Sequence, residues 1–300
     1  MKRAAIVVMV AALAACSSNP NEHKPAPLPV LPQKAMQLKL HKQWSVNVGD
    51  GLAGDVIKLH AATQANLTYI ASRDGVVLAT DEQGKTVWQQ KTKLPITSGV
   101  AAGYGVVVIA TAKGEVLALN PANGQTLWRK PLLAPVLASA ALSAETIVIQ
   151  SNDGKVYGLD SKTGEKRWVY DTPVPSLSLR GYATPLIDEN LVIVATETGK
   201  IVALDVNTGI AQWESRIATS EGRSELARMV DVDGDMLMTI NKELYVASYQ
   251  GQLAALNIKD KPDPLWTLPT STTQSLAEGL GNVYVVDAAS SILAVDQETG

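Results

Sequence analysis

Short apolar runs recur along residues 44–300, separated by segments rich in Gly, Asn, Asp and Pro. Four clear runs cover residues 106–110, 146–150, 191–196 and 244–248, and they are dominated by β-branched and aromatic side chains. Runs of this length and composition between turn-forming residues are typical of buried strands. Beyond the N-terminal apolar segment, no stretch has helical periodicity. The pattern therefore predicts an all-β fold.

A tryptophan marks a repeat within this pattern. Successive Trp residues lie 40 to 53 residues apart, which is close to the length of a propeller blade. The six positions are Trp44, Trp88, Trp128, Trp168, Trp213 and Trp266. A similar block precedes each of the last five, for example GKIVALDVNTGIAQW from Gly199. One more copy, SSILAVDQETG from Ser290, stops before its Trp.

Two columns of these blocks have the same character in all six copies. The first column holds a small residue, at Ala79, Ala118, Gly158, Ala203, Ala255 and Ala294. The second holds Asp or Asn two positions later, at Asp81, Asn120, Asp160, Asp205, Asn257 and Asp296. Asp and Asn side chains hydrogen-bond to nearby backbone and so initiate tight turns. Each block thus predicts two strands joined by an Asx turn, with the Trp on the second strand.

The Trp column also predicts how neighbouring blades touch. A large indole on a repeat unit can be buried only against the next unit. We expect the small-residue column to let the neighbouring blade approach, so that both columns serve one contact between blades. The expected docking residues are Trp88, Trp128, Trp168, Trp213 and Trp266.

The block resembles the Trp-docking motif, A-x-D-x-x-x-G-x-x-x-W, of the pyrroloquinoline-quinone-type propellers. This resemblance covers most of residues 44–300 and implies a β-propeller of four-stranded antiparallel blades. About six blades are represented. Because Trp44 has no block of its own and the last block has no Trp, we expect the natural protein to continue for about two more repeats.

The N-terminus has the pattern of an export signal. Two basic residues precede an apolar stretch, 4–15, which is long enough for a signal-peptide core and too short to span a bilayer. It ends in LAAC, which resembles the lipobox of bacterial lipoproteins. We expect residues 1–15 to be the signal peptide and Cys16 to carry the lipid; the alternative is an ordinary signal followed by a free cysteine. Ser17 after the Cys suggests the outer membrane.

The segment after Cys16 has the composition of a spacer. Residues 16–36 contain five prolines and few side chains to bury, which favours an extended, polyproline-like tether. We therefore divide the chain into a signal peptide, a lipidated tether over 16–36 and a propeller over 37–300.

Charge and composition exclude several function classes. The formal net charge is −3 and the pI is near 5.7, so the basic surface that nucleic-acid binding requires is not apparent. The single cysteine rules out an internal disulfide, and His23, His41 and His60 have no metal-site spacing. Quinone-dependent enzymes usually carry a pair of adjacent cysteines, which this chain lacks. We expect no cofactor, no catalytic residue and no nucleic-acid partner.

The acidic run from Asp231 to Asp235 is a candidate cation or contact loop. Alternating carboxylates can supply oxygen ligands to calcium. The spacing differs from an EF-hand, since Gly234 is in the fourth place and Lys242 in the twelfth. Another kind of calcium loop remains an alternative, but we favour a charged contact surface at a blade edge.

A second candidate is the segment VPSLSLRG, residues 174–181. In an extended conformation Leu177 and Leu179 would lie on one face and leave Arg180 available to a carboxylate or backbone partner. The alternative is an ordinary blade strand with both leucines in the core. The residues alone do not decide between these two interpretations.

PSLSLRG, the DVD of residues 231–233 and ASYQGQLAALN of residues 247–257 together resemble the BamB family of outer-membrane assembly lipoproteins. The resemblance implies an eight-bladed propeller that faces the periplasm and is a non-catalytic subunit of the β-barrel assembly machinery. The implied partners are the POTRA domains of BamA, and also unfolded outer-membrane proteins. It implies a partner-binding loop at Leu177, Leu179 and Arg180, with a second contact patch at Asp231 and Asp233.

Two rival functions stay open at this stage. One is a small-ligand binder or, less favoured, a quinone-dependent dehydrogenase that uses the central channel of the propeller. The other is a periplasmic lipoprotein that binds cell-wall polysaccharide. In the favoured hypothesis, loops around Arg180 and Asp231 dock a protein partner by strand addition or charge pairing.

Overall fold

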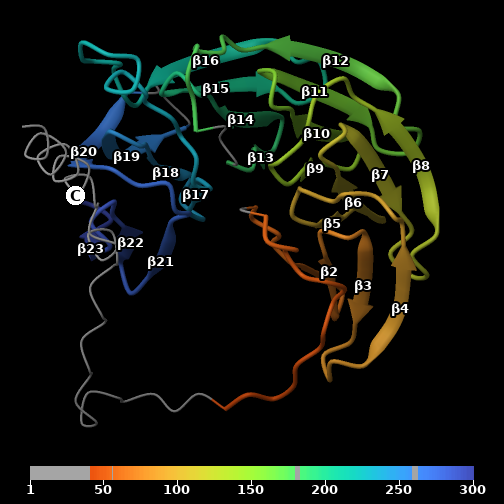
Figure 1. Ribbon diagram of the computed structural model, residues 1–300. Coiled ribbons are helices and arrows are strands. Elements are labelled where there is room, and N and C mark those ends of the chain that lie inside the picture. The colour runs from red at the N-terminus through yellow and green to blue at the C-terminus, as the bar shows by residue number, and fades with distance from the viewer. Residues whose placement is uncertain (1–40, 56, 180–182, 259–262) are drawn as a thin grey trace, which may run out of the picture. The chain divides into compact units, whose positions relative to one another are not determined.

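The computed structural model describes residues 41–55, 57–179, 183–258 and 263–300 (Figure 1). The chain divides into two compact units, 1–43 and 44–300, and all the described strands lie in the second. Within the described residues there is no helix long and apolar enough to cross a membrane. The predicted signal peptide, Cys16 and the tether lie outside the described residues.

The second unit consists of six antiparallel sheets that follow the order of the chain. The first three have four strands each: β1 (Ala62–Gln64), β2 (Leu67–Ala71), β3 (Val76–Thr80) and β4 (Thr86–Lys91); β5 (Ala101–Gly103), β6 (Val106–Ala110), β7 (Glu115–Leu119) and β8 (Thr126–Pro131); β9 (Ala141–Leu142), β10 (Thr146–Gln150), β11 (Lys155–Asp160) and β12 (Lys166–Asp171).

The fourth and fifth sheets also have four strands, and the sixth has three: β13 (Leu186–Asp188), β14 (Leu191–Ala195), β15 (Lys200–Asp205) and β16 (Ala211–Arg216); β17 (Leu237–Met238), β18 (Glu243–Ala247), β19 (Gly251–Asn257) and β20 (Pro264–Thr270); β21 (Ala277–Gly279), β22 (Asn282–Val286) and β23 (Ile292–Asp296). In Figure 1 the sheets follow one another along an arc, with β4, β8 and β12 on its outer side. The predicted β-propeller of antiparallel blades is confirmed.

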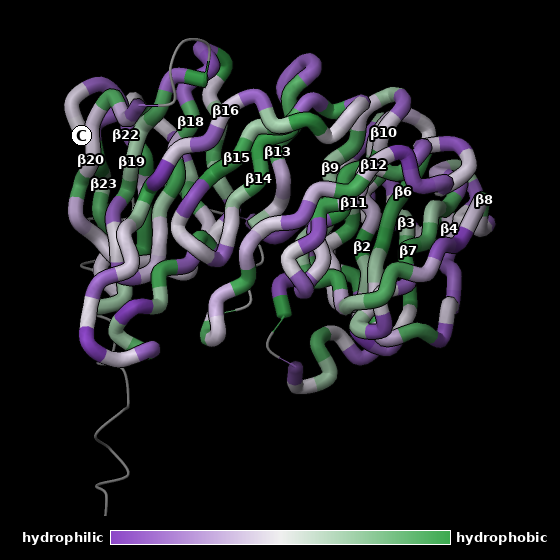
Figure 2. Tube along the Cα trace, turned by 90° about the horizontal axis from the view of Figure 1, so that it is seen from above, coloured by the Kyte–Doolittle hydropathy of each residue, from purple (hydrophilic) through white to green (hydrophobic). Residues whose placement is uncertain are grey.

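Burial explains why the apolar runs marked the strands so well. Every residue of β3 and of β6 is buried. β6 lies between two neighbouring blades, whereas β3 lies between the second blade and the segment before the first blade. The hydropathy colours of Figure 2 follow this division, with hydrophobic stretches along strands such as β14 and β15. The outer strand β8 is different, since it buries Trp128 and exposes the residues on either side. The four predicted runs coincide with β6, β10, β14 and β18, to within a residue at each end.

Each docked Trp reaches the turn of the following blade. Its indole N–H donates a hydrogen bond to a backbone carbonyl there, and its ring covers the glycine that closes the same turn. The donor and acceptor pairs are Trp88 to Pro121 (2.8 Å), Trp128 to Ser161 (3.0 Å), Trp168 to Val206 (2.9 Å) and Trp266 to Gln297 (2.9 Å). The covered glycines are Gly124, Gly164, Gly209 and Gly300. The contact satisfies the indole donor and buries its ring at once.

The small-residue column has a role within each blade as well as the one between blades that the sequence suggested. Ala118 is directly opposite Trp128 on the neighbouring strand of its own blade, and Gly158 is opposite Trp168 in the same way. A Cβ atom added to Gly158 would be 2.1 Å from the Trp168 ring. The small residue therefore makes room for the Trp of its own blade. It also packs toward the neighbouring blade, since Ala118 belongs to one buried cluster with Ile147 and Ile149 of the third blade.

Trp44 docks in the same way, although no block precedes it. Its indole N–H donates to the carbonyl of Glu82 at 2.8 Å, and its ring covers Gly84 in the first blade. The sequence pattern missed this contact because the docking residues were identified by the block that precedes each Trp, and Trp44 has none. For Trp213 the corresponding turn includes residues 259–262, which lie outside the described residues.

Five of the six Asx turns form as predicted within the described residues, and the turn after Asn257 includes residues outside them. In the third blade, Asp160 Oδ1 accepts the backbone N–H groups of Lys162 and Thr163 at 3.0 and 2.9 Å, and the Thr163 hydroxyl at 3.1 Å. These donors, the Thr163 N–H above all, hold the pKa of Asp160 below its usual range. The turn thus presents Gly164 in a fixed position to Trp128.

Two glycine substitutions separate the Trp contact from backbone strain. Gly164 and Gly105 both have positive φ, +70° and +80°, but a Cβ on Gly164 would be 2.6 Å from the Trp128 ring, whereas on Gly105 it would meet nothing within 4 Å. We expect Gly105→Ala to lower the free energy of unfolding by about 1 kcal/mol, from strain alone. We expect Gly164→Ala to lower it by about 2 to 4 kcal/mol, because a steric term is added. Urea unfolding measures both, and equal losses would contradict the docking role of the turn.

Candidate functional site

The two predicted contact segments lie in connections between blades. Residues 172–185 connect β12 to β13, and residues 217–236 connect β16 to β17. Because every blade repeats the same up-and-down strand order, connections from a fourth strand to the next first strand emerge at the same end of the sheets. The fold therefore brings together two segments that are about fifty residues apart in sequence.

The leucine segment is an exposed connection and not a strand. Leu177 is 42% exposed and Val174 is 49% exposed, while Leu179 is partly buried. The alternative interpretation, a blade strand with both leucines in the core, is wrong because residues 172–179 pair with no strand. Arg180 lies outside the described residues.

The acidic loop is buried, so the expectation of a charged contact surface is wrong. Asp231 is 0% exposed and Asp233 is 6% exposed. Val230 and Val232 are buried as well, and Val232 joins the hydrophobic core between the fourth and fifth blades. A contact loop at a blade edge would leave these carboxylates in solvent. Both faces are covered here, since the connection runs inside the unit before it reaches β17.

The three carboxylates of this loop accept hydrogen bonds from two segments, the connection between β12 and β13 and the segment before the first blade. Asp231 Oδ2 accepts the backbone N–H of Leu179 at 3.0 Å, which fixes the leucine segment. Asp235 Oδ1 accepts the N–H of Thr184 at 2.7 Å. Asp233 Oδ2 is 3.4 Å from the ammonium of Lys58, which belongs to the segment before the first blade. The acidic loop therefore holds the connection between β12 and β13, and the segment before the first blade, by hydrogen bonds and an ion pair.

These contacts bear on the calcium alternative. The carboxylates of Asp231, Asp233 and Asp235 are directed at three separate partners and do not converge. In the part of the chain that the structure describes, no group of three or more His, Cys, Asp or Glu side chains is arranged to hold a metal ion.

Asp231 is in an unusual electrostatic environment. Its Oδ2 accepts one N–H, but its buried Oδ1 has no hydrogen-bond partner among the described residues. Burial first, and then the negative charges of Glu197 and Asp233, raise the pKa of Asp231 to about 7. The backbone N–H of Leu179 acts in the opposite direction. Around neutral pH this carboxyl group is thus divided between its charged and neutral forms.

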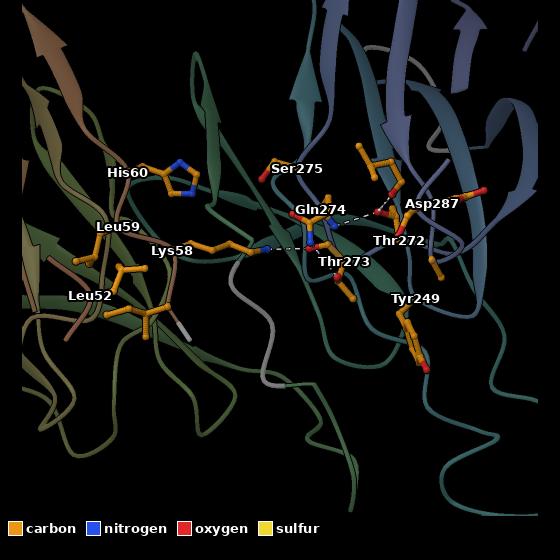
Figure 3. A pocket seen from close by; sticks show the side chains of 14 residues that line it. Leu52, Lys58, Leu59, His60, Tyr249, Thr272, Thr273, Gln274, Ser275 and Asp287 are labelled. Atoms are coloured by element: carbon orange, nitrogen blue, oxygen red, sulfur yellow. Dashed lines mark hydrogen bonds between the residues drawn. The ribbon is translucent and has the colours of Figure 1, made fainter. Parts of the chain in front are cut away.

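A cavity of about 920 Å³ lies beside this loop, lined by residues from the segment before the first blade and from the fifth and sixth blades (Figure 3). Lys58 extends across it, and its ammonium donates to the carbonyls of Thr273 at 2.8 Å and Asp233 at 3.2 Å. His60 Nε2 is 3.7 Å from Asp235 Oδ2. No sequence motif marked Lys58 or His60 for these contacts, because the partners are about 175 residues or more away.

The substitution Asp231→Asn tests this environment through pH. The folded protein binds the Asp231 proton more tightly than the unfolded chain does, so this group favours folding at low pH. Its contribution is lost as pH rises from about 4, the unfolded value, to about 7. Asn stays neutral, and its carbonyl oxygen can still accept the Leu179 N–H.

We therefore expect the two proteins to have similar free energies of unfolding at pH 4. At pH 8 the Asp231→Asn variant should be the more stable by an amount on the order of a few kcal/mol. Urea unfolding at pH 4, 6 and 8 measures the difference. Curves that run parallel across this range would show that Asp231 is not held in an unfavourable charged state.

Comparison with known proteins shows which family this chain matches. The family described as outer membrane protein assembly factor BamB matches residues 73–300. The outer membrane protein assembly factor BamB of Pseudomonas aeruginosa is 45% identical over 297 residues, which cover 98% of this chain and 77% of that protein.

Solved structures agree with this match. The crystal structure of BamB from Moraxella catarrhalis has a TM-score of 0.76 at 31% identity, over 81% of this chain and 73% of that one. A europium-containing methanol dehydrogenase has a TM-score of 0.64 at 13% identity, over 78% of this chain and 62% of that one, a likeness that concerns the fold alone. The matching relatives are assembly factors and not enzymes. The chain belongs to the family of outer membrane protein assembly factor BamB.

Proposed function

We propose that this protein is a non-catalytic scaffold lipoprotein of the β-barrel assembly complex. It binds the periplasmic POTRA domains of BamA and assists the folding and insertion of outer-membrane proteins. The observation that carries the proposal is an exposed apolar segment, residues 174–179, which is fixed from beneath by a buried carboxylate, Asp231.

The segment has the properties of a binding anchor. Val174 and Leu177 are about half exposed, although large aliphatic side chains gain free energy when they leave water. Its backbone is tied to the body by the Leu179 N–H on Asp231, and its Ser176 hydroxyl donates to Glu225 at 3.1 Å. A segment that is already ordered loses little conformational entropy on binding, so more of the contact energy contributes to affinity.

The five residues singled out in the sequence divide into two roles under this proposal. Leu177 and Arg180 contact the partner. Leu179, Asp231 and Asp233 support them, since Asp231 and Asp233 are buried and Leu179 is only partly exposed. Substitution of the buried aspartates would weaken binding indirectly, through the shape of the connection.

The rest of the proposal concerns attachment to the membrane. Residues 1–15 are the signal peptide, Cys16 carries the lipid, and residues 16–36 are a tether between the outer membrane and the propeller. The propeller then lies on the periplasmic side, where the POTRA domains and unfolded outer-membrane proteins are accessible. Six antiparallel sheets, with five Trp contacts among the described residues, supply the body of such a scaffold.

The substitution Leu177→Asp tests the contact. We expect it to weaken binding to the purified periplasmic domain of BamA at least about tenfold, a loss of about 1.4 kcal/mol or more, because it places a charge in a desolvated contact. Ile240→Asp is the matched control, since Ile240 is 97% exposed in the turn after β17, at the opposite end of that strand from the connection.

Titration calorimetry measures both affinities, and circular dichroism checks that each variant is folded. Failure of the folded wild-type protein to bind would refute the proposal. If wild type binds and Leu177→Asp binds equally well, the contact lies on another surface of the protein.

A further inference from the structure

A second exposed loop lies against the leucine segment. Residues 219–228, part of the connection from β16 to β17, are all exposed, and Leu226, in the turn near the end of this range, is 60% exposed. Glu225 joins this loop to the leucine segment, because its Oε2 accepts the Ser176 hydroxyl at 3.1 Å. The two segments belong to different blade connections, so this contact places Leu226 and Leu177 on adjoining parts of one surface.

Hydrogen bonds within the protein hold the exposed loop in its conformation. Arg228 pairs with Oε1 of Glu225, so that one carboxylate serves both the loop and the leucine segment. The Ser220 hydroxyl donates to the carbonyl of Arg228 and closes the loop at its base. The side-chain amide of Gln250 donates to the carbonyl of Leu226 at 3.4 Å. These contacts hold the backbone around Leu226, while the Leu226 side chain is exposed to solvent.

Close packing inside the loop, and buried residues directly after it, also hold its conformation. Gly222 has a φ of +128°, and a Cβ there would be 2.6 Å from Cβ of Ala227, so the loop is folded closely back on itself. Met229 and Val230, immediately after it, are buried and anchor the loop next to Asp231. The same connection thus contains both the buried Asp231, which accepts the Leu179 N–H, and the exposed Leu226.

The charges of the loop indicate the kind of partner. Residues 219–228 contain two glutamates and two arginines, so the loop has no net charge. A surface for anionic lipid headgroups would need an excess of Lys or Arg. Exposed aliphatic side chains surrounded by balanced polar groups are instead typical of a protein contact, with an apolar centre and a polar rim.

We propose that residues 219–228 form the second half of the docking surface for the protein partner, with Leu226 as its anchor and Glu225 as the residue that positions it against residues 174–179. The inference rests on the proposed function, since the occupant is the same periplasmic partner. It adds a contact that no motif identified, and it makes the surface a composite of two connections.

Leu226→Asp is the direct test, with the protein titrated against the purified periplasmic domain of BamA. We expect at least a fivefold loss of affinity, and no change in thermal stability, because Leu226 contacts solvent. Ile240→Asp again serves as the control for an added exposed charge. Glu225→Gln should reduce affinity by a smaller factor and should increase backbone amide exchange in residues 174–179.

The outcomes distinguish the two proposals. If wild type binds, Leu177→Asp weakens binding and Leu226→Asp does not, the docking surface is confined to the leucine segment and the present inference is overturned. Absence of binding by folded wild type overturns both proposals. Loss of affinity in both variants, with the control unchanged, supports the composite surface.

Discussion

The fold depends on one repeated contact, an indole on the outer strand of a blade that covers a turn glycine of the next blade. Its hydrogen bond to the turn carbonyl, as from Trp128 to Ser161, fixes direction as well as distance. Because each blade is held mainly by its neighbours, stability accumulates along the row of blades in the way expected of repeat proteins. The same contact sets the spacing between blades and therefore the positions of the connections that emerge from them.

That spacing accounts for the candidate site. Connections that start from successive outer strands lie at one end of the sheets, and two of them meet where the Ser176 hydroxyl donates to Glu225. Beneath this surface three carboxylates lie beside the apolar core. Asp231 and Asp235 accept hydrogen bonds from the connection between β12 and β13, and Asp233 accepts one from Lys58. A buried carboxylate is unfavourable unless donors satisfy it, which explains why burial raises the pKa of Asp231. The site thus combines blades held together by Trp contacts, a buried carboxylate that holds the leucine segment, and exposed leucines on the surface above it.

Much of the fold could be predicted from the sequence, because its determinants are local. The apolar runs, the Asx column and the Trp period each report a contact within one blade or between adjacent blades, and the β-propeller follows from them. The docking of Trp44 was missed because no block precedes this Trp to mark it as part of the repeat. The sequence did not show that each small residue also faces the Trp of its own blade, since that pairing depends on the register of the strands.

The site was predictable only in part, for a physical reason. PSLSLRG and DVD could be singled out by composition and by family resemblance, but whether their side chains are buried depends on packing among several blades. Asp231 was expected at the surface and is fully buried. Leu226 had no signal, since a lone leucine in a polar loop is ordinary in sequence. Lys58 likewise gains its role only when the segment before the first blade meets the fifth and sixth.

The most direct test of the account is photo-cross-linking in living cells, with a photoreactive amino acid in place of Leu177. Our account predicts a specific adduct between this position and BamA, and none from the same amino acid at Ile240. Adducts from position 177 to cell-wall material or to unrelated proteins, with BamA present and the variant folded, would contradict it.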